Sequence, residues 1–185
     1  MSGAVRTADP AAAWHTDHVY FARLLDLLQG EVELSRRGRQ PRYEVMLDVV
    51  EYLQVYGDRY HHAREDAAFA LLARRRPALA GMLERLQHDH VLLARLGERL
   101  LQYLNEIVEG FAVAPEELHA VATSYVIFYR EHLAIEEGEI LRAAFGALSV
   151  EDWDAIERKL PSRFDPLFGA KPEQRYRELR NTLRI

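Results

Sequence analysis

Four histidines and two glutamates recur along the chain in a fixed order. The segment 17–24 reappears as 89–96 with identical residues at six of eight positions, and a His-x-x-x-Glu element follows each copy. Equivalent histidines lie 72 and 71 residues apart, so the chain carries an internal duplication whose second half starts near residue 77. Many first-row transition metals accept imidazole and carboxylate ligands. The repeat therefore predicts a metal site formed by His18, His61, Glu65, His90, His132 and Glu136.

Composition limits the other chemistry that the chain can perform. Its 185 residues predict one domain, and the absence of cysteine excludes disulfides, thiolate chemistry and iron–sulfur ligation by the chain itself. The net charge is −5, and the one basic cluster, at 36–42, is typical of a solvated loop, so no nucleic-acid partner is expected. No apolar run is long enough to span a membrane, and no signal-like segment opens the chain. We therefore expect a cytoplasmic protein without a membrane partner.

The pattern of apolar residues predicts an all-α fold. Apolar residues recur at spacings of three and four rather than alternating, as in the segment 92–100. Prolines precede four long amphipathic stretches, and Gly30 and Gly110 are candidate stop signals. The four helices are predicted at roughly 10–29, 41–75, 77–109 and 115–146. An up-and-down four-helix bundle is expected over residues 1–148.

A short helical extension, residues 149–185, is expected to follow this bundle. Ser149 and Asp152 resemble a helix-capping pair, which predicts a fifth helix to about Leu160. Residues 173–183 are expected to form a last short helix. The extension should pack on the bundle through Tyr176, Leu179 and Leu183.

The six candidate ligands are distributed over all four predicted helices. Residues four apart lie one turn apart on the same helix face, so each His-x-x-x-Glu element can direct two side chains at one point. The neighbours on those faces are apolar, including Phe21, Phe69, Leu93 and Ile140, so the ligands should point inward. Buried carboxylates are strongly disfavoured as bare charges, and a pair of divalent or trivalent cations would neutralise them. Packing alone gives no reason to repeat buried histidine and glutamate in register.

One part of the assignment has two overlapping registers. The segment 61–66 offers either His61 with Glu65 or His62 with Asp66. Alignment of the two halves favours the first pair. His62 and Asp66 are then expected on an adjacent, solvated face.

Four further residues lie near the predicted ligands. His15 and Gln87 each lie three residues before a repeated histidine, while Tyr125 and Tyr129 share a helix face with His132. Each could hydrogen-bond to a ligand side chain on the side away from the metal, as partners of metal-bound residues often do. Alternatively, each could be an ordinary core or surface residue. His88 and His119 are not expected to be ligands, since the first points away from the site and the second lies in a polar helix start.

Two glycines fall inside the predicted helices close to the ligands. Glycine at such a position costs about 1 kcal/mol relative to alanine. Close helix packing, or a local widening of the bundle that admits a small ligand, would offset this cost at Gly57 and Gly138.

The ligand pattern resembles that of the hemerythrin-like domains, four-helix bundles that hold an oxo- or hydroxo-bridged, non-haem di-iron centre. The resemblance covers residues 10–146. It is closer to the bacterial iron-centre repair and nitric-oxide-responsive branch than to the invertebrate oxygen carriers, whose fifth histidine would fall where Leu86 and Ala94 stand. The resemblance implies two irons bridged by Glu65 and Glu136, with the four histidines as terminal ligands and an open position for a diatomic ligand.

Two alternatives to this centre follow from the residues. By ligand type alone, manganese or zinc would also accept mixed imidazole and carboxylate coordination. A ferritin-like di-iron bundle would need repeated Glu-x-x-His elements, but the chain has only Glu116 with His119, at a helix start.

Three classes of function remain at this point. The first is binding or sensing of oxygen or nitric oxide, the second is iron–sulfur repair, iron donation or nitric oxide reduction under stress, and the third is an iron- or redox-responsive interaction module. The repair proteins carry an additional cysteine-containing domain, whereas this chain has no cysteine. Binding or sensing of a diatomic ligand is therefore the preferred function, with a protein partner or a homo-oligomer left open and turnover undetermined.

Overall fold

The structure is a computed structural model that describes residues 10–185, and these residues form helices but no strands. The predicted all-α fold is confirmed. Within the described part of the chain, no helix is both long and apolar enough to cross a membrane. The expectation that no signal segment opens the chain concerns mainly residues 1–9, which lie outside the described residues.

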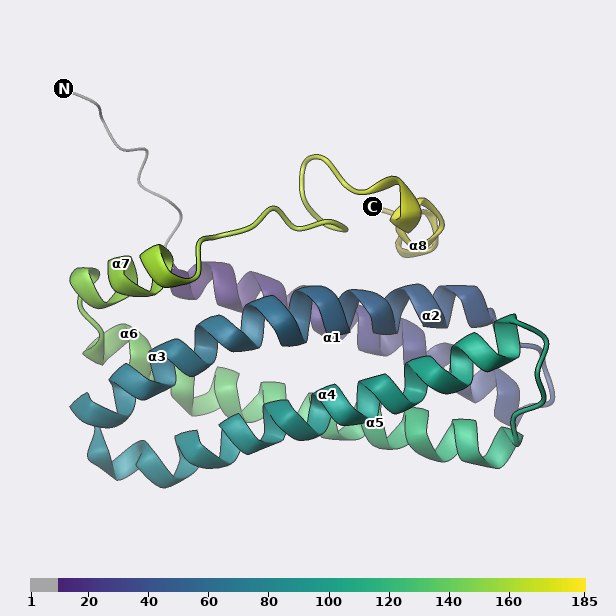
Figure 1. The fold of residues 1–185 in the computed structure, drawn as a ribbon, viewed down its shortest axis with the longest axis horizontal. Coiled ribbons are helices and arrows are strands. Elements are labelled where there is room, and N and C mark those ends of the chain that lie inside the picture. Colours follow the sequence, from purple (N-terminus) through teal and green to yellow (C-terminus); the bar gives the residue numbers. More distant parts are fainter. Residues whose placement is uncertain (1–9) are drawn as a thin grey trace.

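Four long helical runs lie side by side and make up the body of the molecule (Figure 1). The first run is α1 (Pro10–Arg36). The second joins α2 (Tyr43–Tyr52), the π-helical segment η1 (Leu53–His61) and α3 (His62–Arg75) without a break.

The third and fourth runs come from the second half of the chain. The third consists of the short 3₁₀ turn η2 (Pro77–Leu79) and α4 (Ala80–Val108). The fourth joins α5 (Pro115–Ile135), the π-helical segment η3 (Glu136–Ile140) and α6 (Leu141–Ala147). Pro77 and Pro115 occupy the first helical turns, as predicted, because their missing N–H groups have no partner there.

The predicted end of the first helix at Gly30 is wrong, since α1 continues to Arg36. Glu31 and Val32 are buried, and the Arg42 backbone N–H donates to the Glu31 carboxylate at 2.8 Å. These tertiary contacts outweigh the cost of one glycine inside a helix, which is about 1 kcal/mol. By contrast, Gly110 follows α4 with φ +90°, a conformation that favours glycine, so that predicted stop is confirmed.

The two π-helical segments adjoin candidate ligands and contain both of the glycines noted in the sequence. Segment η1 includes Gly57 and ends at His61, while η3 begins at Glu136 and includes Gly138. A π-helical turn is wider than an α-helical one and is frequent at functional sites. Both glycines therefore lie where the helix is locally widened. A Cβ atom at Gly57 would also lie 2.8 Å from the Tyr129 hydroxyl, so close packing applies at Gly57 as well.

The apolar core has two parts, and histidines contact aromatic residues of both. The larger part includes Phe21, whose ring centroid lies 5.0 Å from that of His61. The smaller includes Phe69, whose ring stacks at 5.8 Å from that of His90. Apolar side chains thus surround the candidate ligands.

The C-terminal segments contact the long helices. Helix α7 (Val150–Lys159) contacts α3, and α8 (Arg177–Leu183), preceded by the 3₁₀ turn η4 (Gln174–Tyr176), contacts α2 (Figure 1). Ser149 and Asp152 form the predicted reciprocal cap, with the Ser149 N–H donating to the Asp152 carboxylate at 2.8 Å. Tyr176 and Leu179 are fully buried, and Leu183 packs partly buried against the larger core.

Candidate metal centre

All six predicted ligand side chains meet between the long helices. Their exposed fractions range from 1% to 6%, which places two carboxylates and four imidazoles out of contact with bulk water. The first helix and α4 each contribute one histidine, and the second and fourth runs each contribute a His-x-x-x-Glu element. The members are His18, His61, Glu65, His90, His132 and Glu136.

The histidines form two pairs whose Nε2 atoms face each other. In the first pair, His18 and His61, these atoms are 2.9 Å apart, and in the second pair, His90 and His132, they are 3.1 Å apart. Two nitrogens bound at right angles to one metal, each at about 2.1 Å, would lie about 3 Å apart. The spacing within each pair therefore fits one metal ion per pair.

Each carboxylate contacts both histidine pairs. Glu65 places Oε1 at 3.0 Å from His61 Nε2 and 3.2 Å from His18 Nε2, while its Oε2 lies 3.6 Å from His90 Nε2. Glu136 places Oε1 at 3.1 Å from His132 Nε2 and Oε2 at 3.6 Å from His18 Nε2. The two oxygens of each glutamate are thus divided between the pairs.

Several of these buried oxygens have no hydrogen-bond partner among the described residues. They are Oε2 of Glu65 and both carboxylate oxygens of Glu136. A buried polar atom without a partner costs about 1–3 kcal/mol, and more when it is charged. Cations bound between the pairs would contact these oxygens, so the donor set fits a metal centre.

Further carboxylates hold the outer nitrogens of three of the histidines. Glu137 lies 2.7 Å from His18 Nδ1, Asp17 lies 2.9 Å from His61 Nδ1, and Asp66 lies 2.9 Å from His90 Nδ1. Such contacts fix the tautomer and orientation of metal-binding imidazoles. The role of these carboxylates was not predicted from the sequence, although one signal was available. An acidic residue directly follows each candidate glutamate, as in Glu65-Asp66 and Glu136-Glu137.

The expectation that His62 lies on a solvated face is wrong. Its side chain is 2% exposed, and it groups with Glu65, His90 and His132 as residues that could hold one ion. Alignment of the two halves selected His61 and left His62 aside. Residues three and four positions before a helical glutamate both lie next to it, however, so both histidines can adjoin Glu65. Asp66 is 40% exposed, in keeping with its predicted face, yet it contacts His90.

The other residues considered in the sequence take different places. His15 is largely exposed and lies 2.9 Å from Glu137, so it contacts the centre only through that carboxylate. Tyr125 and Tyr129 are fully buried, and the Tyr129 hydroxyl lies 3.4 Å from His62 Nε2.

Three residues stay outside this cluster. Gln87 is half-buried. His88 is exposed and contacts the Glu84 carbonyl, and His119 lies in the first turns of α5, so both lie apart from the six candidate ligands.

Neighbouring carboxylates raise the pKa of His18 and His90 in the metal-free protein. Burial by itself lowers the pKa of His18, but hydrogen bonds to Glu137 and Glu65 outweigh it and raise the pKa to about 10. For His90, burial also acts downward, while Asp66 and other carboxylates raise the pKa to about 10. Metal ions must therefore displace protons from these rings.

The glutamates are held ionised, which suits cation binding. Burial raises the pKa of Glu65, but the adjacent His61 reverses this and brings it well below its usual range. Burial likewise acts upward on the pKa of Glu136, and His132 contributes to its net decrease. Burial lowers the pKa of His62 well below its usual value, so that imidazole is neutral.

A family model for the hemerythrin HHE cation-binding domain matches residues 9–144, which include all six candidate ligands. The chain belongs to the hemerythrin family. The hemerythrin match and the buried histidine–glutamate group together indicate a metal site, for which iron is the usual ion. No curated protein matches the chain.

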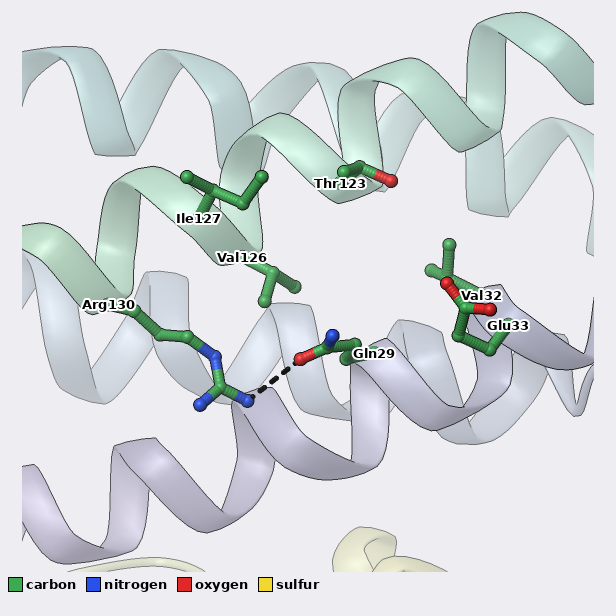
Figure 2. A pocket seen from close by; sticks show the side chains of 7 residues that line it. All are labelled: Gln29, Val32, Glu33, Thr123, Val126, Ile127 and Arg130. Carbon is green, nitrogen blue, oxygen red and sulfur yellow. Dashed lines mark hydrogen bonds between the residues drawn. The ribbon is translucent and has the colours of Figure 1, made fainter.

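The surface of the hemerythrin domain has hollows beside the centre and others that include none of the six candidate ligands. A shallow hollow is lined by His18 and Glu137, and another by His61 and Asp17. A separate groove between α1 and α5 includes none of the six candidate ligands (Figure 2). There Arg130 donates a hydrogen bond to the Gln29 side-chain oxygen at 3.1 Å.

Proposed function

We propose that the chain binds two iron ions and uses them to bind or sense a small diatomic ligand, oxygen or nitric oxide. The observation that carries this proposal is the division of each glutamate between the two histidine pairs. In this assignment His18 and His61 would hold one ion, His90 and His132 would hold the other, and Glu65 and Glu136 would be shared between them. The irons would supply the position at which the diatomic ligand binds.

The protein side chains would keep this position dry and the ligands oriented. Phe21 and Trp14 pack against His61 with ring centroids 5.0 and 6.2 Å away. The carboxylates on the outer nitrogens restrain three of the four rings. A buried and restrained ligand set favours retention of iron over its donation to another protein, which supports binding or sensing over the repair alternative.

The test is iron content followed by optical titration. Metal-free protein is loaded anaerobically with ferrous iron and desalted, and iron per chain is measured. About two irons per chain and a spectral change on adding oxygen or nitric oxide are expected. Two irons without any spectral change would reject ligand binding, and no retained iron would reject the centre. Parallel loading with manganese and zinc tests the less favoured metals.

A second candidate, an iron- or redox-responsive interaction module, is favoured by one contact. Arg64, directly before Glu65, donates hydrogen bonds to the Glu157 carboxylate and to the Leu160 carbonyl in the C-terminal extension. Movement of Glu65 on metal binding would thus reach α7. Hydrogen exchange in residues 150–160 should slow on iron loading if the extension reports metal state, and unchanged exchange would reject this function.

The finer architecture is also part of the proposal. We assign the four helical runs to an up-and-down bundle because short connections join consecutive runs (Figure 1). The bundle would comprise residues 1–148 and the packed extension residues 149–185. Localisation in the cytoplasm, and a partner protein or homo-oligomer, remain predictions.

A further inference from the structure

His62 is a buried polar residue that the six-ligand centre does not use. It is the first residue of α3, directly after the π-helical segment η1. Because it precedes Glu65 by three residues, its side chain adjoins the same glutamate that His61 reaches from four residues away. Both histidines are almost completely buried, with exposed fractions of 2% and 1%.

The His62 ring lies on the side of the second pair. It stacks on the His90 ring with centroids 4.1 Å apart and planes inclined by 4°, and its centroid lies 5.5 Å from that of His132. A nitrogen of His62 lies within 4.8 Å of the potential ligand atoms of Glu65, His90 and His132. Three imidazoles therefore gather on this side of the centre, whereas the other group found among the described residues has two, His18 and His61, together with Glu65.

A carboxylate also lies behind His62. Asp58, one turn earlier, has Oδ1 3.2 Å from His62 Nδ1, although neither atom has a hydrogen-bond partner among the described residues, unlike the outer nitrogens of His18, His61 and His90. Gln54 holds the second Asp58 oxygen at 2.5 Å and also donates to the Ala94 carbonyl at 3.1 Å. With Nδ1 beside Asp58, Nε2 is the His62 nitrogen left for a metal ion, and its present partner is the Tyr129 hydroxyl at 3.4 Å. A carboxylate behind an imidazole is the common arrangement for metal ligands.

The helix opposite leaves space for this support. A Cβ atom at Gly97 of α4 would overlap the Gln54 amide nitrogen, at 2.1 Å. Gly97 is therefore the residue that admits Gln54, and through it Asp58, beside the centre. A side chain at Gly97 would have to displace the Gln54 amide from its place between α4 and η1.

We propose that His62 is a fifth histidine ligand, bound to the metal ion held by His90 and His132. This inference rests on the proposed di-iron function. The second-pair ion would then have three imidazole ligands and the first-pair ion two, with the glutamates shared equally. In the competing structural role, His62 would only link Asp58 to the Tyr129 hydroxyl, 3.4 Å from its Nε2.

The test counts metal-bound imidazoles in the wild-type protein loaded with ferrous iron alone. Each imidazole bound through one nitrogen keeps an N–H on the other, and in the diferrous protein it gives one exchangeable proton signal shifted by the metal. Five such signals are expected, and His62→Ala should remove one of them. The matched controls are Tyr129→Phe, which deletes the other contact of His62, and His88→Ala on the surface; both should keep five.

The outcomes separate this inference from the proposed function. Four shifted signals in iron-loaded wild-type protein, unchanged by His62→Ala, would overturn the ligand assignment while leaving the di-iron centre in place. Wild-type protein that retains no iron would overturn both. If His62→Ala does not fold, the wild-type count still decides, because five signals require a histidine beyond the four repeated ones.

Discussion

The two His-x-x-x-Glu turns are equivalent by sequence repeat, yet their surroundings differ. Each is followed by an acidic residue that reaches a histidine of the other half. Asp66 contacts His90, and Glu137, 71 positions later, contacts His18. Both halves therefore have an acidic residue at this position, and each of these residues contacts the outer nitrogen of a histidine in the other half.

The residues on the helix face beside each turn differ between the two halves. The first half has Gln54, Asp58 and His62, and the positions 71 residues later hold Tyr125, Tyr129 and Leu133. The polar set of the first half lies against the aromatic set of the second, with the Tyr129 hydroxyl 3.4 Å from His62. A duplicated scaffold thus encloses a centre whose two sides are chemically different.

The shared carboxylates should give the largest effect, because each belongs to both sides. We expect Glu65→Ala or Glu136→Ala to abolish retention of both irons. His61→Ala or His132→Ala should lower iron content less, since each removes a ligand from one side only. Elemental analysis after anaerobic loading measures this, with His119→Ala as the control that keeps full iron content. Equal iron in the glutamate variants and the control would contradict the shared role.

Protons should compete with metal at three histidines, two of the first pair and one of the second. Carboxylates outweigh burial and raise the pKa of His18 and His90 to about 10 and of His61 to about 9, above the ordinary value of 6.5. A raised folded-state pKa stabilises the protein fully below 6.5, and this stabilisation is lost as pH rises through 9 to 10. The free energy of unfolding of metal-free protein should therefore fall between pH 7 and 10.

Metal affinity should change in the opposite direction over the same interval. Because binding displaces these protons, affinity should rise by up to about tenfold per pH unit for each proton released. Urea unfolding of the metal-free protein and competition with a chelator at several pH values measure the two trends. A metal-free protein that becomes more stable towards pH 10 would contradict the assignment of protonated histidines.

The helical fold and the cluster of six residues could be predicted from the sequence. The spacing of apolar residues indicates helices, and the internal repeat marks the six residues. It could not predict the π-helical segments, since no residue pattern distinguishes them from a continuous helix with a glycine. The burial of His62 was missed for a related reason. Alignment of the halves identifies only residues that are the same in both. The position equivalent to His62 in the second half is Leu133, so the repeat gave no sign that His62 is buried at the centre.

The histidines of the two His-x-x-x-Glu elements differ in whether a carboxylate holds the outer ring nitrogen, and this difference should have a smaller effect on metal affinity. Asp17 lies 2.9 Å from His61 Nδ1, but its equivalent Asp89 lies 3.8 Å from Arg85, and His132 Nδ1 has no hydrogen-bond partner among the described residues. Loss of such a partner weakens metal affinity by about 10–100-fold. Asp17→Asn should show this weakening in chelator competition, and Asp89→Asn should show little. Equal weakening in both variants would mean that the two sides are supported alike.

The two glycines in the π-helical segments should give the smallest effects, with opposite signs. A Cβ atom at Gly57 would lie 2.8 Å from the Tyr129 hydroxyl, so Gly57→Ala should destabilise the metal-free protein by about 1–3 kcal/mol through overpacking. At Gly138 no atom lies within 4 Å of the added Cβ, and Gly138→Ala should stabilise it by about 0.4–1 kcal/mol by restricting the unfolded chain. Urea unfolding measures both. If Gly138→Ala destabilises as much as Gly57→Ala, then both glycines serve the π-helical backbone itself rather than the space around Tyr129.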